Sequence, residues 1–124
     1  MSTIKDINLA ELGSEEVAWA ARQMLVLEEI KNDFSKNKPL EGLNIGACMH
    51  VTKETANLML TLKEGGANVA LCASNPLSTK DSVAAYLAEN DIEVHAVWGV
   101  SNEEFFKHLN SVLDTEPDIT MDDG

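Results

Sequence analysis

Apolar residues recur every three or four positions through the first third of the chain, which is the spacing of one face of an α-helix. The stripe consists of Val17, Ala20, Met24, Leu27, Ile30 and Phe34. It predicts a helix over residues 14–34, with Ser14 as its N-terminal cap. The segment NKPLEG then ends the helix, because Pro39 disfavours helical geometry at Lys38 and Gly42 tolerates a turn.

Beyond this helix, short apolar runs alternate with segments of helical spacing. The predicted strands are residues 43–49, 68–73, 93–99 and 118–123, and the predicted helices are residues 53–66, 79–90 and 101–113. Gly65 and Gly66 end the first of these helices, and Ser101 with Glu104 forms a capping box for the last. Such alternation predicts an α/β fold, a three-layer αβα, Rossmann-like domain with a parallel sheet of about four strands and an additional N-terminal helix.

Composition and charge narrow the class of protein. The 124 residues are enough for one domain, and 44% hydrophobic with 24% charged residues is typical of globular proteins. A formal net charge of -12 without a basic cluster argues against DNA or RNA as a partner. The longest apolar stretch is too short and too polar to span a membrane, and we find no secretory signal. Cys48 and Cys72 lie in apolar runs, where free thiols suit a reducing, cytoplasmic location.

Polar residues gather where the predicted strands end. In parallel sheets ligands bind beyond the carboxyl ends of the strands, where the strand order reverses. His50 follows the first strand, and its imidazole is either a proton-transfer group or an ordinary polar residue ending a buried strand. Thr52 can cap the next helix, and Glu54 in its first turn is equally well explained by the helix dipole.

The other strand ends leave similar alternatives open. Ser78 or Thr79 can cap the helix that follows, which is the interpretation that spacing alone favours. Asp122 and Asp123 point opposite ways on an extended backbone, so at most one of them faces a given site.

No motif for a metal, redox or phosphate site is present in the sequence. The acids lack an accompanying cluster of histidines or cysteines, and no C-x-x-C pair occurs. Neither G-x-G-x-x-G nor G-x-x-x-x-G-K-[ST] is found, so no glycine-rich phosphate loop is predicted. His95 in a strand and His108 on a helix fit a structural interpretation better than a functional one.

Three motifs at these strand ends resemble the S-adenosyl-L-homocysteine hydrolase (adenosylhomocysteinase) family. They are H-x-T-x-E-T from residue 50, S-N-P-x-S-T-x-D from residue 74, and D-D-G from residue 122. The similarity extends over nearly all 124 residues, in order and with matching spacing, beginning at IKDINLAELG. The three motifs together are far more specific than any one alone.

The resemblance implies reversible hydrolysis of S-adenosyl-L-homocysteine to adenosine and L-homocysteine. In the family, tightly bound NAD oxidises the ribose 3′-hydroxyl, and a base then removes the acidified 4′ hydrogen. The 5′ thiol is eliminated, water adds, and the ketone is reduced again. The family also implies that the intact enzyme is a homotetramer and that its partners are these small molecules.

Motif positions imply roles for individual residues. The implied catalytic residues are His50, near the 5′ leaving group, and Asp123, the active-site carboxylate. The implied substrate-binding residues are Met49, His50, Thr52, Glu54, Ser78 and Asp123. Thr52 and Glu54 would contact adenine, Glu54 by accepting from the amino group, although Glu54 alone does not decide between adenine and hypoxanthine.

The sequence departs from the family at its end, because family members have several hundred residues and this one stops at Gly124. We therefore expect residues 1–124 to form part of a substrate-binding domain, without the NAD-binding domain, without bound cofactor and with little or no turnover alone. One alternative is a stand-alone nucleoside-binding or regulatory module. A receiver-like signalling domain is disfavoured, because the acidic pair follows the last strand instead of the first.

Overall fold

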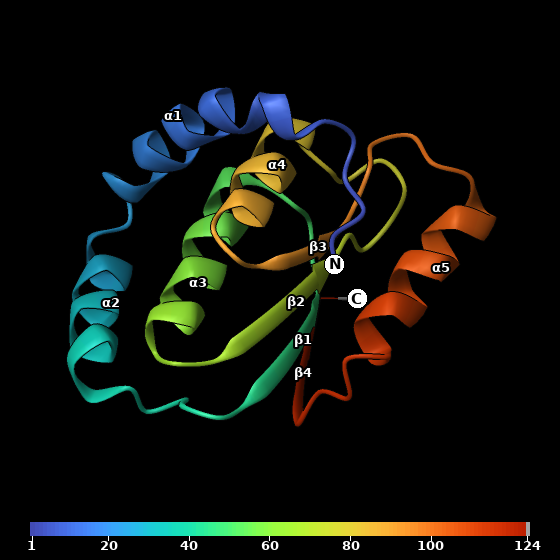
Figure 1. The fold of residues 1–124 in the computed structure, drawn as a ribbon. Coiled ribbons are helices and arrows are strands. Elements are labelled where there is room, and N and C mark those ends of the chain that lie inside the picture. The colour runs from blue at the N-terminus through green and yellow to red at the C-terminus, as the bar shows by residue number, and fades with distance from the viewer. Residues whose placement is uncertain (124) are drawn as a thin grey trace.

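A computed structural model describes residues 1–123 of the chain. Its elements follow one another along the chain as a short 3-10 helix, five α-helices and four strands (Figure 1). The helices are η1 (Ile7–Leu9), α1 (Ala10–Ala21), α2 (Leu25–Asn37), α3 (Lys53–Glu64), α4 (Asp81–Glu89) and α5 (Asn102–Leu113). The strands are β1 (Asn44–Cys48), β2 (Asn68–Cys72), β3 (Glu93–His95) and β4 (Ile119–Asp122).

All strand pairs are parallel, and the strand order is β3-β2-β1-β4. The chain steps from β1 to β2 to β3 on one side of β1 and then returns to the other side with β4. The strand order therefore reverses between β1 and β4, and ligands of such sheets bind beyond this point. We call the edge at which all four strands end the carboxyl edge.

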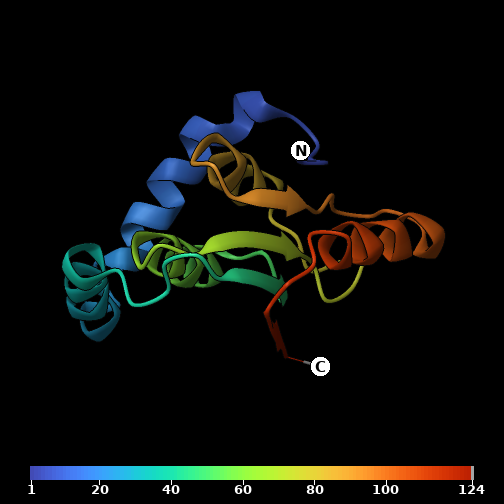
Figure 2. The same ribbon diagram turned by 60° about the horizontal axis from the view of Figure 1, so that its bottom comes forward.

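Helices cover both faces of the sheet, as the three-layer prediction requires. Helices α3 and α4 pack on one face, with α1 outside both of them and α2 outside α3, while α5 lies on the opposite face (Figures 1 and 2). The main core lies on the first face, where Ala47, Leu71 and Val94 are fully buried against Met59 of α3 and Leu87 of α4. The predicted α/β fold is confirmed.

The N-terminal helical region differs from the prediction. The stripe from Val17 to Phe34 belongs to two helices, because the chain turns between Ala21 and Leu25. Ser14 lies inside α1 and is not a cap, so this part of the prediction is wrong. Helix α1 packs on α4 and α3 and buries Val17 and Ala20, whereas α2 packs on α3 without a buried residue. The turn thus lets the two segments pack against different neighbours.

Several predicted boundaries are confirmed by their hydrogen bonds. Thr52 caps α3 by accepting from the Thr55 N–H at 3.3 Å, and Ser101 caps α5 by accepting from the Glu104 N–H at 3.1 Å. Helix α3 ends at Glu64 with Gly65 as its C-cap, and Gly66 adopts a φ of 98°, which an L side chain rarely tolerates.

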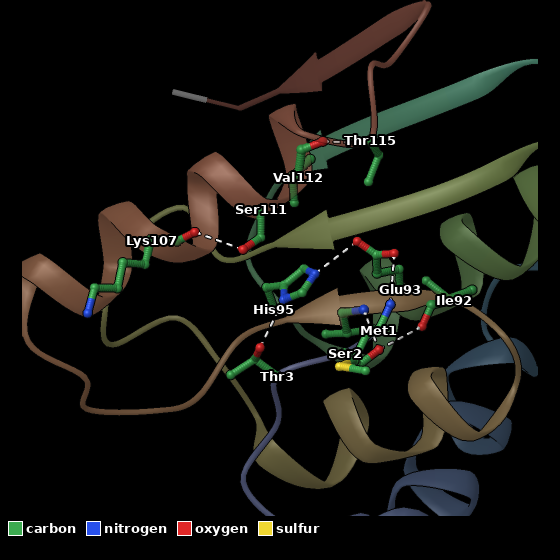
Figure 3. A network of polar contacts seen from close by, with 11 residues as sticks. Met1, Ser2, Thr3, Ile92, Glu93, His95, Lys107, Ser111, Val112 and Thr115 are labelled. Atoms are coloured by element: carbon green, nitrogen blue, oxygen red, sulfur yellow. Dashed lines mark hydrogen bonds and ion pairs between the residues drawn. The ribbon is translucent and has the colours of Figure 1, made fainter.

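The N-terminal segment adds a further parallel bridge beside β3. The Thr3 N–H donates to the Val94 carbonyl at 2.8 Å, and the Ala96 N–H donates to the Thr3 carbonyl at 3.0 Å. The Met1 ammonium lies 3.1 Å from the Glu93 carboxylate, and His95 bonds to both Thr3 and Glu93 (Figure 3). These contacts give His95 the structural role that its strand position predicts.

Candidate active site

The carboxyl ends of β1 and β2 lie in register. Cys48 pairs with Cys72, so His50 and Ser74 each follow the paired position by two residues. The Ser74 Oγ lies 2.6 Å from Nδ1 of His50, whose ring is otherwise exposed. A serine that sequence reasoning did not select is thus the hydrogen-bond partner of the candidate catalytic histidine.

The segment before α4 runs beside the segment before α3. The Val51 N–H donates to the Ser78 carbonyl at 2.8 Å, and the Lys80 N–H donates to the Val51 carbonyl at 2.9 Å. These backbone bonds place the segment from Ser78 to Lys80, which follows β2, against Val51, the residue between His50 and Thr52. Three of the candidate residues, His50, Thr52 and Ser78, are therefore neighbours at the carboxyl edge.

The predicted capping role of Ser78 or Thr79 is wrong. Helix α4 begins at Asp81, and its N-cap residue Lys80 makes no side-chain capping bond. Instead Ser78 Oγ accepts from the Asn75 N–H at 3.2 Å and donates to the Asn75 carbonyl at 3.1 Å. Ser78 Oγ also lies 3.5 Å from Ser74 Oγ, which makes it the far end of a short polar chain leading to His50.

Asp123 lies at the same edge, directly after β4. Cys48 of β1 pairs with Asp122, and the Asp123 N–H donates to the Cys48 carbonyl at 3.4 Å. The acid therefore follows the strand beside β1, at the point where the strand order reverses. Its side chain is exposed, and within residues 1–123 no hydrogen bond or ion pair joins it to His50. The glycine of the D-D-G motif, residue 124, lies outside the described residues.

Met49 and Glu54 flank His50 and Thr52 in the sequence. Met49 packs partly buried against the main core, and its N–H donates to the Cys72 carbonyl at 3.0 Å. Glu54 is half-exposed in the first turn of α3, where its carboxylate lies 3.5 Å from the Lys53 ammonium. Capping and dipole effects explain the local geometry of Thr52 and Glu54 without excluding a ligand.

An apolar groove lies beside Glu54, between α2 and α3. Its volume is about 580 Å³, within the range of small-molecule pockets. The residues lining it are Gln23, Met24, Leu25, Val26, Leu27, Ile30, Glu54, Thr55 and Leu58. Glu54 is the one candidate residue in this set, and His50, Thr52 and Ser78 do not line the groove.

The two thiols at the carboxyl edge are not poised for chemistry. Burial raises the pKa of the Cys72 thiol well above its usual range, and burial likewise raises the pKa of Cys48 beside Asp122 and Asp123. A thiolate is the reactive form of cysteine, so both groups favour the inert thiol.

Among residues 1–123, no group of three His, Cys, Asp or Glu side chains is arranged to hold a metal ion. None of the described helices has the length and apolar character that crossing a membrane requires.

The comparisons of this sequence with known proteins agree on one family. The sequence model described as S-adenosyl-L-homocysteine hydrolase matches residues 1–124. An adenosylhomocysteinase of Aquifex aeolicus is 55% identical over 122 residues, which are 98% of this chain and 29% of that protein. One of Sulfolobus acidocaldarius is 50% identical over 121 residues, again 98% of this chain and 29% of that protein. An S-inosyl-L-homocysteine hydrolase of Methanococcus maripaludis is 48% identical over 124 residues, all of this chain and 30% of that protein.

Proposed function

The chain belongs to the S-adenosyl-L-homocysteine hydrolase family, and we propose that it supplies the nucleoside-binding side of an adenosylhomocysteinase active site. One observation carries this proposal: the segments that follow β1, β2 and β4 lie together at the carboxyl edge, where the strand order reverses. His50 lies there in hydrogen-bond contact with Ser74. The chain spans about 29% of the length of the relatives it matches, so the activity of the whole enzyme is part of the proposal.

His50 and Asp123 are the residues we assign to proton transfer. Hydrolysis breaks the bond between the 5′ carbon and sulfur, gives the sulfur a proton and leaves the hydroxyl of water on the carbon. The His50 ring is bound through Nδ1 and exposed elsewhere, which leaves Nε2 to exchange a proton at this position. The Asp123 carboxylate, exposed at the neighbouring strand end, provides a second proton acceptor.

Thr52, Glu54, Met49 and Ser78 are the residues we assign to the nucleoside. The Glu54 carboxylate can accept a hydrogen bond from the amino group of adenine, and the apolar groove beside it suits one end of a flat purine. Hypoxanthine presents a ring N–H to the same carboxylate. The relative named S-inosyl-L-homocysteine hydrolase is 48% identical, so both bases are candidates, and adenine is the one we propose.

NAD does not fit the residues of this chain. Dinucleotide phosphates are bound by glycine-rich connections whose backbone N–H groups open a helix. The connection between β1 and α3 contains no glycine, and Glu54 places a negative charge in the first turn of α3. We therefore propose that NAD binds to a separate domain outside residues 1–124. This chain alone, which we place in the cytoplasm, binds nucleoside weakly, because its pocket is only part of the active site, and does not turn it over. The homotetramer of the family is likewise part of the proposal for the whole enzyme.

Calorimetry with adenosine and inosine tests the binding assignment. Glu54→Gln removes the charged acceptor and is expected to weaken adenosine binding by roughly 10-fold to 100-fold, the loss typical of a hydrogen bond to a charged group. Glu103→Gln is the matched control, because Glu103 occupies the same position in the first turn of α5 and is exposed. Equal adenosine affinity in the wild type and Glu54→Gln would contradict the assignment, and tighter binding of inosine would reverse the choice of base.

Incubation with S-adenosyl-L-homocysteine and NAD tests the activity assignment. Thiol detection is expected to find no homocysteine above the buffer control. Robust homocysteine release would show that the chain is catalytically complete. Adenosine binding in the low micromolar range without release would favour the stand-alone nucleoside-binding module.

A further inference from the structure

We propose that Ser74 is a positioning residue that determines which ring nitrogen of His50 carries the proton. The proposal rests on the assignment of His50 to proton transfer and adds a residue that acts through it. Its basis is the 2.6 Å separation between Ser74 Oγ and His50 Nδ1, the closest polar contact of the candidate site. Because the in-register pairing of Cys48 with Cys72 aligns the two strand ends, this contact follows from the sheet itself.

The hydrogen bonds around Ser78 decide where the Ser74 proton goes. A serine hydroxyl has one proton to donate and two lone pairs. Ser78 Oγ donates its proton to the Asn75 carbonyl and accepts from the Asn75 N–H, so it can only accept from Ser74. The Ser74 proton therefore has two acceptors, His50 Nδ1 at 2.6 Å and Ser78 Oγ at 3.5 Å. The 2.6 Å contact fits donation in either direction, but the 3.5 Å contact is at the limit of a hydrogen bond and holds the Ser74 proton poorly, so we assign that proton to Nδ1.

This donation fixes the tautomer of the neutral ring. With Nδ1 accepting, the ring proton lies on Nε2, which has no hydrogen-bond partner in the described part of the chain. His50 in its neutral form consequently presents a hydrogen-bond donor to a bound ligand. Such a donor suits an oxygen or sulfur atom with a free lone pair, which is what the 5′ position of the proposed substrate carries.

Ser74 also has an arrangement available for the charged ring. When Nδ1 gains a proton, Ser74 Oγ can accept from it and turn its own proton toward Ser78 Oγ, which retains a free lone pair. Both protonation states of His50 thus keep a hydrogen-bonded Nδ1. The same serine can hold the ring in place while Nε2 loses and regains its proton.

The loop that carries Ser74 is well held. The Leu77 N–H donates to Asn75 Oδ1 at 2.9 Å, and the Gly99 N–H donates to the Pro76 carbonyl at 2.7 Å. The bond from the Val51 N–H to the Ser78 carbonyl ties the loop to the residue after His50. A side chain on a constrained loop can orient its partner, because little rotational freedom remains to be lost.

Nitrogen-15 NMR of the histidine rings tests the proposal on the free chain. The chain has three histidines, and the resonances missing from His50→Gln identify those of His50. At a pH where imidazoles are neutral, we expect the His50 Nδ1 shift of an unprotonated nitrogen and the Nε2 shift of a protonated one. In Ser74→Ala the two shifts should move toward each other as the tautomers mix, and Ser74→Thr, which keeps the hydroxyl, should restore the separation.

Ser35→Ala is the matched control, since Ser35 is exposed on α2 and its hydroxyl bonds to the Asn32 carbonyl. It should leave the His50 nitrogens unchanged. Identical His50 shifts in the wild type and Ser74→Ala, or a protonated Nδ1 in the wild type, would overturn the proposal. The measurement needs no substrate, so its failure is separate from that of the proposed function: loss of adenosine binding in Glu54→Gln would still stand, and the reverse also holds.

Discussion

His95 and His108 meet on the α5 face of the sheet, with their ring centroids 6.5 Å apart. His95 has hydrogen-bond partners at both nitrogens, whereas Nε2 of His108 is buried without one among the described residues. Burial lowers the pKa of His108; nearby Glu104 opposes this effect and His95 adds to it. A neutral, poorly solvated histidine at this position makes the folded state sensitive to acid.

Acidification below neutral pH is therefore expected to reduce stability through His108. The pKa of His108 in the folded chain is lower than the ordinary 6.5, so the unfolded chain binds the proton more readily. The contribution of His108 to stability is therefore complete above the ordinary pKa of 6.5 and is lost as the pH falls from there through the lower pKa of the folded chain. Urea unfolding at a series of pH values from about 7 to about 5 measures the slope. His108→Phe should flatten it, and His50→Gln, which changes an exposed ring, should not.

Glu93 acts in a separate, lower range. Burial alone would raise the pKa of its carboxyl, but the hydrogen bonds from His95 and the N-terminal ammonium lower it below the ordinary 4.5. Its contribution to stability is lost only when the pH falls below that value. An unchanged slope in His108→Phe would show that a group other than His108 is responsible.

At the candidate site, the sequence predicted the role of some residues and missed that of others. Thr52 could be recognised as a cap from its position before an apolar helix, because capping depends on neighbours in sequence. Ser74 could not be recognised in this way, because its contact with His50 arises from strand pairing across 24 positions of the chain. Aligning the predicted ends of the first two strands would have placed the two residues side by side, which is the signal that was available.

Among the elements, helices α1 and α4 pack closely at Gly13. A side chain at Gly13 would overlap the Ser82 backbone carbonyl and lie 2.9 Å from Tyr86 Cβ. The absence of a side chain there allows the two helices to touch. Periodicity could not locate the turn between α1 and α2, because the apolar spacing continues through it with neither glycine nor proline. Packing of α1 on α4 decides where that helix lies.

Gly13→Ala should consequently destabilise the fold, although alanine is the better helix former by about 1 kcal/mol. Forcing a methyl group into a packed contact typically costs about 1–3 kcal/mol, so the net change should be a loss. Glu15→Ala on the exposed side of α1 is the control and should have little effect. The free energy of unfolding in urea measures both variants. A stability gain in Gly13→Ala would mean that α1 and α4 separate readily.

At the scale of the whole molecule, charge is unevenly balanced. The chain carries 21 acidic and 9 basic residues, and its ion pairs are mostly exposed. Exposed ion pairs contribute little, so repulsion among the surplus acids works against the compact state. The layers and the parallel sheet were predictable, because alternation of strands and helices determines them. The strand order β3-β2-β1-β4 was not predicted, because the same alternation is compatible with other orders.

Salt should accordingly stabilise the protein. Raising sodium chloride from about 0.01 M to about 1 M shortens the screening length from about 30 Å to about 3 Å, which weakens the repulsion. The thermal midpoint should therefore rise with salt. The double variant Glu29→Gln/Asp33→Asn removes two exposed acids from α2 and should have a smaller salt response. An equal response in both proteins would assign the effect to something other than charge.

The ion pair between the Met1 ammonium and Glu93 has a practical consequence for protein production. An affinity tag fused ahead of Met1 would turn the ammonium into an uncharged amide. The added residues would lie beside the backbone bridge between Thr3 and His95. Acetylation of the amino terminus would remove the same charge. Purification handles of this kind would perturb the edge of the sheet before any experiment on the candidate site began.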